Sequence, residues 1–402
     1  MVKKNSLLIK VIIISLSVCP AIALGEGNRN LFLIGVMSIS PIIILRFFEF
    51  DKLDFLLLLF LITIAIFPTL FHPDTMRWST VLYSVMFGLT FIAYKQLLRQ
   101  KHFSVLNYIK ILKLIIYAYF IVLLIQQFCV LTGLPVFNVS NYDVQEPWKL
   151  NALASEPSHS GRILPLLMYS YITIYEKLLN RSYDFKKDVK ADKWVWIAFV
   201  WSVTTMGSGT AILFLFVFLT KFIRLKKLIK TISISIMLIL MIGLVENKSV
   251  QRTKEVILAT LTLNEDVILN ADHSAAMRIL PVMVAFEKAG FNSLNDWVGN
   301  GVDFTTNFLS DEIPGLAEGT SGGGMFQIWL EYGFISFALF VMFSLFNSYR
   351  KRDYVSFLFW FLLVFAYGVN NQIVWLCIVL LYTNQYFEKK QILIIGQTYL
   401  KK

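Results

Sequence analysis

The sequence predicts an all-α polytopic membrane protein with about twelve transmembrane helices. Of its 402 residues, 57% are hydrophobic and only 16% are charged, and the mean hydropathy is +0.65. A soluble chain carries about 25% charged residues, so this composition is typical of an integral membrane protein. Several apolar runs reach the ~20 residues that a helix needs to cross a bilayer, and their continuous apolar character favours helices over strands.

The apolar runs place the spans along the chain. The first run also resembles a secretory signal, because Lys3 and Lys4 precede it and Ala21 and Ala23 follow it. We favour an uncleaved first span, since many further candidate spans come after it. The predicted spans lie near residues 7–24, 31–48, 54–71, 78–98, 109–132, 160–179, 194–206, 209–222, 231–245, 325–347, 354–369 and 372–387.

The distribution of basic residues sets the predicted orientation. The runs 194–206 and 209–222 form either a tight hairpin or one long kinked span. With a hairpin, the inner segments hold 28 of the 37 Lys and Arg residues and the outer segments hold nine. This asymmetry is the positive-inside rule, and it places both termini in the cytoplasm. It also accounts for the net charge of +11 without nucleic acid as a partner.

We predict one integral membrane domain, 1–402, with two long outer segments, 133–160 and 246–324. Apolar positions at helical spacing in 252–263 and 274–290 predict short helices within the second segment. The glycine-rich stretch 318–327 closes that segment, and we interpret it as a flexible loop rather than a phosphate-binding loop.

Motifs for metals and cofactors are missing from the sequence. It has no HExxH pair, no phosphate-binding glycine loop, no dinucleotide fingerprint and no Asp-x-Asp pair. The four histidines are divided, with His102 on the predicted inner side and the other three outside. We therefore expect neither a metal nor a cofactor, so that arginine would have to neutralise any phosphate charge.

The stretch SEPSHSGR, residues 155–162, stands directly before a predicted span. The N-terminus of a helix offers free N–H groups and a positive dipole, both suited to an anion. We expect Ser155 to be the N-cap, with the following proline in the first turn. Glu156, His159 and Arg162 are candidate catalytic residues. The alternative for Arg162 is an interfacial arginine that extends to the lipid headgroups.

Arg278, in the amphipathic segment of the large outer loop, is the fourth candidate catalytic residue, and its alternative is a solvated helix face. An acid within a span usually faces a cavity or a partner, so Glu331 is either a site residue or the partner of an arginine. Arg77 has the alternative of pairing with Asp74. The candidate substrate-binding residues are Arg77, Arg252, Ser158, Trp297 and Glu331.

Surface exposure is the alternative for Arg252, and the interfacial aromatic belt is the alternative for Trp297. Ser158 is included because it lies between Glu156 and His159.

Four features together resemble the Wzy family of O-antigen polymerases and the related O-antigen ligases. They are SEPSHSGR, the short paired spans around GSGTA, the large loop with Arg278 and WVGNGVDF, and the late helix FQIWLEYGFIS. The resemblance covers the back two-thirds of the chain. It implies a GT-C-like fold and an enzyme of the bacterial cytoplasmic (inner) membrane, with its active site facing the periplasm. Such enzymes join oligosaccharide repeat units carried on undecaprenyl diphosphate and release the lipid diphosphate.

The resemblance also implies roles and partners. Arg162 and Arg278 would stabilise the departing diphosphate, and Glu156 or His159 would accept the proton of the attacking sugar hydroxyl. Trp297 would stack on a sugar ring. A flippase and a chain-length regulator of the same pathway would be partners, beside the membrane lipid.

Other functions remain open at this stage. The ligases carry a His-Asn pair before the late helix, whereas this chain has Gly322–Gly324, which favours a polymerase. A flippase or solute transporter is the main alternative, although such proteins keep short outer loops and place ionisable residues near the bilayer midplane. A non-catalytic scaffold is the third. The sequence does not distinguish O-antigen from capsule or exopolysaccharide.

Overall fold

A computed structural model describes residues 2–19, 30–139, 144–223, 255, 258–262, 264–271, 273–313, 322–351 and 353–399. Within these ranges every regular element is a helix, and the only β-pairing there is an isolated bridge between Arg350 and Asp353. The prediction of an all-α protein is therefore confirmed for the described chain.

The chain forms two compact units. Unit 1 combines Met1–Ile13, Phe32–His102 and Val256–Tyr382, and unit 2 combines Ile14–Leu31, Phe103–Glu255 and Thr383–Lys402. Helices α1 (Val2–Ser17) and α19 (Gln372–Tyr399) contribute residues to both units. The prediction of one integral membrane domain stays a prediction.

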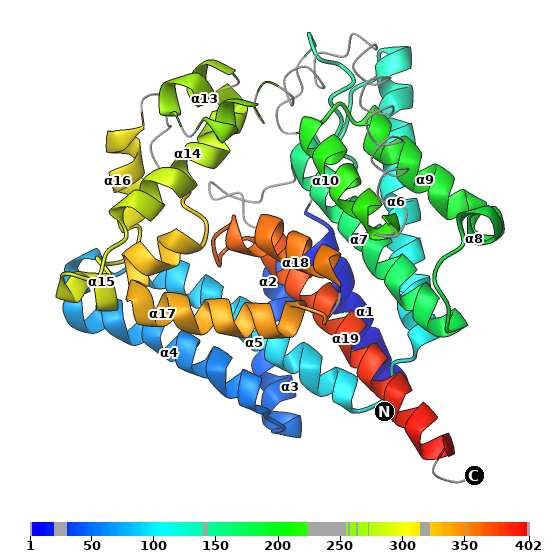
Figure 1. The fold of residues 1–402 in the computed structure, drawn as a ribbon, viewed down its shortest axis with the longest axis horizontal. Coiled ribbons are helices and arrows are strands. Elements are labelled where there is room, and N and C mark those ends of the chain that lie inside the picture. The colour runs from blue at the N-terminus through cyan, green and yellow to red at the C-terminus, as the bar shows by residue number, and fades with distance from the viewer. Residues whose placement is uncertain are drawn as a thin grey trace. The chain divides into compact units, whose positions relative to one another are not determined.

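Unit 1 is built around α17, which lies along α4 and contacts α14, α15 and α16 (Figure 1). Ser336 on α17 donates a hydrogen bond to Thr63 on α4 at 2.9 Å, and the rings of Phe340 and Phe60 are 4.9 Å apart. The helices of unit 1 are α2 (Leu31–Met37), α3 (Ser40–Phe47), α4 (Lys52–Phe71), η1 (Pro73–Thr75), α5 (Trp78–Arg99), α13 (Glu265–Ala271), α14 (His273–Lys288), α15 (Leu294–Val298), α16 (Phe304–Glu312), α17 (Met325–Ser348), α18 (Tyr354–Trp360) and η4 (Phe361–Phe365).

A buried ion network fixes the start of α4 against α5. Asp51 and Asp54 form a capping box, and the fully buried Lys95 lies 3.0 Å from Asp51 and 2.6 Å from Asp54. Arg99 pairs with both carboxylates. Since an unpaired buried charge is costly, this network specifies the register of α4 on α5.

In unit 2, α7 packs on α6, α9 and α10 (Figure 1). Its polar contacts include a buried chain in which the Tyr108 hydroxyl lies 2.7 Å from Ser170, and Ser170 donates to Asn384 at 2.8 Å. The helices are α6 (Val105–Thr132), α7 (Pro157–Leu179), α8 (Phe185–Ala191), α9 (Lys193–Thr205), α10 (Gly209–Leu219) and η2 (Thr220–Phe222).

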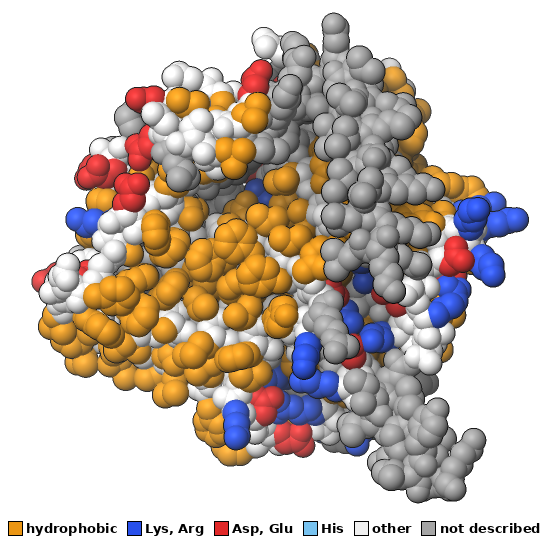
Figure 2. All heavy atoms as spheres, viewed as in Figure 1, with side chains coloured by type: hydrophobic (Ala, Val, Ile, Leu, Met, Phe, Trp, Pro, Cys, Tyr) orange, Lys and Arg blue, Asp and Glu red, His pale blue; other side chains and the backbone are white. Residues whose placement is uncertain are grey.

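Four of the described helices, α4, α5, α6 and α17, are long and apolar enough to cross a membrane. Figure 2 shows hydrophobic side chains gathered over the face that α17 and α4 share. A broad exposed apolar face of this kind is typical of contact with lipid rather than water. The exposed large apolar residues of these two helices include Phe55, Leu59, Ile62, Ile66 and Leu70 of α4, and Ile335, Met342 and Phe346 of α17.

The predicted spans coincide with helices over most of the described chain, with several differences. The first helix, α1, ends at Ser17, and α17 is interrupted at Gly333. The span 31–48 is two helices, α2 and α3, because the helix breaks at Ser38 and Ile39. The span 354–369 changes from α18 to a π-helical turn over Phe361–Phe365, and the last helix continues to Tyr399. The span 231–245 lies outside the described residues.

In the described part of the segment 246–324, α14 coincides with the predicted helix 274–290, whereas α13, α15 and α16 were not predicted and most of 252–263 lies outside the described residues. These short helices bury apolar side chains among themselves. Ala276, Leu280 and Val284 of α14 pack against Ile268 of α13 and Leu309 of α16. Further along α14, Ala285 packs against Phe326, Trp329 and Leu330 of α17. The described helices α13, α14 and α16 therefore pack on one another, and α14 packs on α17.

Candidate functional site

The beginning of α7 gathers four of the predicted site residues in unit 2, Glu156, Ser158, His159 and Arg162. Pro157 is the first helical residue and Glu156 occupies the N-cap position, so the predicted N-cap, Ser155, is wrong by one residue. The exposed Glu156 accepts a hydrogen bond from the Ser158 hydroxyl at 2.9 Å. The Ser155 hydroxyl instead lies 2.8 Å from Nδ1 of the half-buried His159.

A loop held by two amide side chains supports this helix start. Gln126 of α6 donates to Oδ1 of Asn151 at 2.9 Å and accepts from the backbone N–H of Ala152 at 2.9 Å. Asn151 donates to the carbonyl of Ser155 at 3.1 Å, and its own carbonyl accepts from Ser160 at 2.5 Å. Because Gln126 and Asn151 are fully buried, these bonds give the residues before α7 one defined conformation.

Arg162 is 2% exposed. A snorkelling arginine keeps its guanidinium in water, so this burial argues against the headgroup alternative. Gly161 allows α7 to approach the turn 206–209 and α10, because a Cβ at this position would lie 2.7 Å from Cα of Ala211. The guanidinium of Arg162 and the imidazole of His159 are three residues apart, the spacing that places side chains on one helix face.

Unit 1 contains a second group of predicted residues, around a break in α17. Gly333 has φ 82° and ψ 164°, which interrupts the helix and leaves nearby carbonyls without helical donors. The loop after α15 supplies the donors: Asn300 N–H bonds to the Leu330 carbonyl at 2.8 Å, and Gly301 N–H bonds to the Glu331 carbonyl at 3.2 Å. A side chain at Gly333 would overlap the carbonyl of Trp297, so glycine is required here.

Glu331 is fully buried, two residues before the break in α17 at Gly333. Its Oε1 accepts hydrogen bonds from the hydroxyl of Thr305 and from the amide of Gln327, the latter at 3.0 Å. Among the residues that the structure describes, it forms no ion pair with an arginine. The prediction that Glu331 is the partner of an arginine is therefore not met in this part of the chain.

The segment between α4 and α5 contacts the chain after α15 through Arg77 and His72. Arg77 pairs with Asp303 at 2.8 Å, so the expected pairing with Asp74 is replaced by one with a residue far along the chain. This hydrogen bond raises the pKa of Arg77 above its ordinary value. His72 Nε2 lies 2.8 Å from the carbonyl of Gly299.

Trp297 is 41% exposed, and its ring packs against Phe291 and Phe334 at centroid distances of 5.7 Å and 5.5 Å. Its indole N–H donates to the carbonyl of Phe291 at 3.3 Å. The Trp297 ring is therefore packed within an aromatic cluster on one side.

The side chains of two predicted site residues lie outside the described part of the structure. Arg278 lies within α14, but its side chain is outside the described part of the structure, and Arg252 lies wholly outside the described residues. Among the described residues, no group of three or more His, Cys, Asp or Glu side chains could hold a metal ion.

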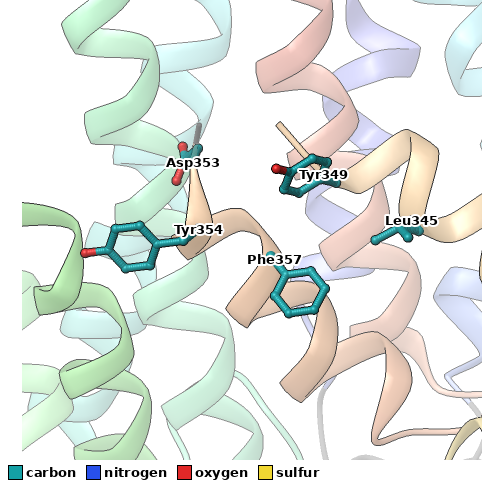
Figure 3. A pocket seen from close by; sticks show the side chains of 5 residues that line it. All are labelled: Leu345, Tyr349, Asp353, Tyr354 and Phe357. Carbon is teal, nitrogen blue, oxygen red and sulfur yellow. The ribbon is translucent and has the colours of Figure 1, made fainter. Parts of the chain in front are cut away.

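A pocket of about 520 Å³ lies at the turn between α17 and α18 (Figure 3). It is lined by Leu345, Tyr349, Asp353, Tyr354 and Phe357, and is mainly aromatic and aliphatic. Arg350 donates to the Asp353 carboxylate at 2.8 Å. Leu345 follows Glu331 by 14 residues, or about 21 Å along a helix, so the pocket belongs to the other end of α17.

The fold defines an all-helical protein with several helices suited to a membrane. The chain matches no protein-family model, no curated protein and no solved structure.

The sequence patterns did not reveal the residues that support the start of α7 and the break in α17. Gln126, Asn151 and Asp303 act through contacts between distant parts of the chain, which no local pattern reveals. Ser155 was predicted only as the N-cap, and its contact with His159 was not predicted, because it lies before the helix.

Proposed function

We propose that this chain is a polysaccharide polymerase of the O-antigen or capsule type. It would be a metal-independent glycosyltransferase that joins oligosaccharide repeat units carried on undecaprenyl diphosphate, and it would release undecaprenyl diphosphate. The observation that carries the proposal is the start of α7, where an exposed carboxylate, an imidazole and a buried guanidinium lie within seven residues.

The proposed location is the bacterial cytoplasmic membrane, with twelve spans, both termini inside and the site facing the periplasm. The support is the charge asymmetry of the sequence and the four long apolar helices. The segments 133–160 and 246–324 then lie on the side where lipid-linked repeat units are polymerised.

The glycosyl-transfer reaction places three requirements on the site. An acceptor must take the proton of the attacking hydroxyl, positive charge must meet the leaving diphosphate, and water must be kept from the anomeric carbon. Glu156 and His159 are the candidates for the first task, and Arg162 of the same helix start is the candidate for the second. A guanidinium held in a buried site stabilises developing phosphate charge more strongly than one in water, because screening there is weaker.

A transporter is the second candidate, and one observation favours it. Glu331 is fully buried within the apolar helix α17, and buried acids in membrane helices often belong to ion or substrate pathways. Its bonds to Thr305 and Gln327 instead fit a structural role at the break in α17.

Deletion of the gene separates these functions. For a polymerase, cells should display a single repeat unit on their surface glycolipid, since export and ligation continue. Full-length polymer stranded on the lipid carrier would indicate a ligase, and single units trapped on the cytoplasmic face would indicate a flippase. Either result would contradict the proposal.

A further inference from the structure

The short helix α8, between α7 and α9 in unit 2, uses its acidic side chains within the fold. Asp188 is 4% exposed, pairs with Arg181 at 2.6 Å and accepts the backbone N–H of Asp184 at 2.7 Å. Asp192 accepts a hydrogen bond from Lys113 at 2.5 Å. Asp184 caps the start of α8 by accepting a backbone N–H at 2.9 Å. The three aspartates of this stretch therefore all have partners inside unit 2.

The lysines of the same stretch are on the surface. They are Lys186, Lys187, Lys190 and Lys193, and all four are exposed. Among the described residues, none of the four forms an ion pair. Figure 2 shows Lys and Arg side chains gathered over α8. The sequence here is mixed in charge, but the surface is positive because the aspartates are paired within the fold.

Two exposed aromatic side chains border these lysines. Phe185 is 44% exposed, and its ring packs against Trp196 and Phe222 at centroid distances of 5.3 Å and 4.4 Å, which fixes α8 in place. Trp194 is 64% exposed, and Nζ of Lys193 lies 5.3 Å from the centroid of its ring. Aromatic rings beside basic side chains are typical of the headgroup level of a membrane.

The helix that follows indicates where the hydrocarbon would lie. α9 begins at Lys193, directly after α8, and it exposes Trp194, Ile197, Val200 and Trp201. These positions recur at helical spacing, so they form one apolar stripe along α9. An exposed apolar stripe is suited to lipid chains rather than water. The lysines of α8 then lie where the stripe begins, at the boundary between hydrocarbon and headgroups.

We propose that this surface binds the headgroups of anionic phospholipids in the cytoplasmic leaflet. We name it the α8 face, and it consists of Lys186, Lys187, Lys190 and Lys193 with Phe185 and Trp194. Each lysine near an anionic membrane surface favours binding by about fivefold, whereas a zwitterionic lipid offers no net charge. The apolar stripe favours lipid over nucleic acid or an acidic protein, because lipid offers hydrocarbon next to its charge. The inference rests on the membrane location in the proposed function and is independent of the reaction.

Photocrosslinking identifies the lipid at the α8 face directly. In the full chain, Trp194 would be replaced by the photoreactive residue p-benzoylphenylalanine. The protein would be reconstituted in nanodiscs with equal amounts of phosphatidylglycerol and phosphatidylcholine, irradiated, and its lipid adducts quantified by mass spectrometry. We expect phosphatidylglycerol adducts to exceed phosphatidylcholine adducts by at least about fivefold at low salt. The ratio should fall at about 1 M salt, where the screening length is about 3 Å.

Charge variants show whether the lysines cause this selection. Lys186→Gln, Lys187→Gln and Lys190→Gln combined should bring the adduct ratio near one, and the corresponding three Arg replacements should keep the wild-type ratio. The matched control removes the same charge from three exposed lysines elsewhere on the predicted inner side, as Lys52→Gln, Lys101→Gln and Lys110→Gln combined. The control should leave the ratio unchanged, because these lysines are not part of the α8 face.

Three results would overturn the inference. They are equal adducts of the two lipids in the chain with all its lysines, an equal fall of the ratio in the α8 variant and in the control, and the absence of any lipid adduct. The last result would leave the face in water, open to nucleic acid or an acidic protein. Selective adducts from a protein that makes no polymer would contradict the proposed reaction and leave the α8 face as proposed.

Discussion

Arg162 is the residue whose placement says most about the chemistry. It is buried in the second turn of α7, three residues after His159 and six after Glu156 in the sequence. A buried guanidinium needs negative or polar partners, and a planar fork of donors suits a diphosphate. Its burial distinguishes it from Arg77, which is exposed and paired with Asp303.

Replacement of Arg162 tests whether its guanidinium stabilises the leaving diphosphate. Arg162→Ala should lower polymer formation by about 30- to 1000-fold, because it removes a charge-assisted hydrogen bond to the leaving group. Arg162→Lys should recover only part of the rate, since an ammonium lacks the bidentate geometry. Polymer would be measured in cells, and insertion checked by the amount of protein in the membrane.

The matched control is Lys149→Ala in the same predicted outer segment. Lys149 pairs with Glu146 at 2.9 Å on the surface, and such pairs contribute little, so polymer should stay near the wild-type level. Polymer from Arg162→Ala equal to that of the control would remove Arg162 from the site.

At the scale of elements, the approach of α7 to α10 positions the candidate site. This approach depends on Gly161, where any side chain would meet the backbone of Ala211. The N-terminal turn of α10, at Ala211, therefore supports the start of α7.

Gly161→Ala should destabilise unit 2 by about 1–3 kcal/mol, because the added methyl group overpacks the contact between α7 and α10. Gly35→Ala is the control: Gly35 is also helical, and nothing lies within 4 Å of the position that its Cβ would take. Thermal unfolding in detergent would give both midpoints. Equal midpoints for the two variants would show that the approach is looser than described.

The sequence predicts the helices better than the contacts between them. Apolar length alone locates α4, α5, α6 and α17, because a bilayer fixes how long such a run must be. The break at Gly333 went unpredicted, since its cause is the loop after α15, which donates to α17 from outside the helix. The Arg77–Asp303 pair likewise joins positions 226 residues apart.

At the scale of the whole molecule, orientation decides whether the proposed site can meet its substrate. Lipid-linked repeat units are polymerised outside, so the starts of α7 and of the segment 246–324 must both face out. The charge asymmetry predicts this arrangement, whereas length and composition alone mark only four of the described helices as able to cross a membrane.

Reporter fusions test the orientation. A reporter joined at Asn295, in α15, should be active only outside, and one joined at Lys187, in α8, only in the cytoplasm, because the basic residues around Lys187 favour retention inside. A cytoplasmic reporter signal at Asn295 would be incompatible with the hairpin and with the proposed site.

The most direct measurement of the central claim uses purified protein in nanodiscs with undecaprenyl-diphosphate repeat units as the only substrate. EDTA is included, because the sequence lacks the motifs that hold catalytic metals. We expect a ladder of products that grow by one repeat unit. One undecaprenyl diphosphate should be released for each bond formed. The polymerase proposal would be contradicted if no ladder formed with or without added metal. If the same preparation glycosylated lipid A-core, the protein would be identified as a ligase.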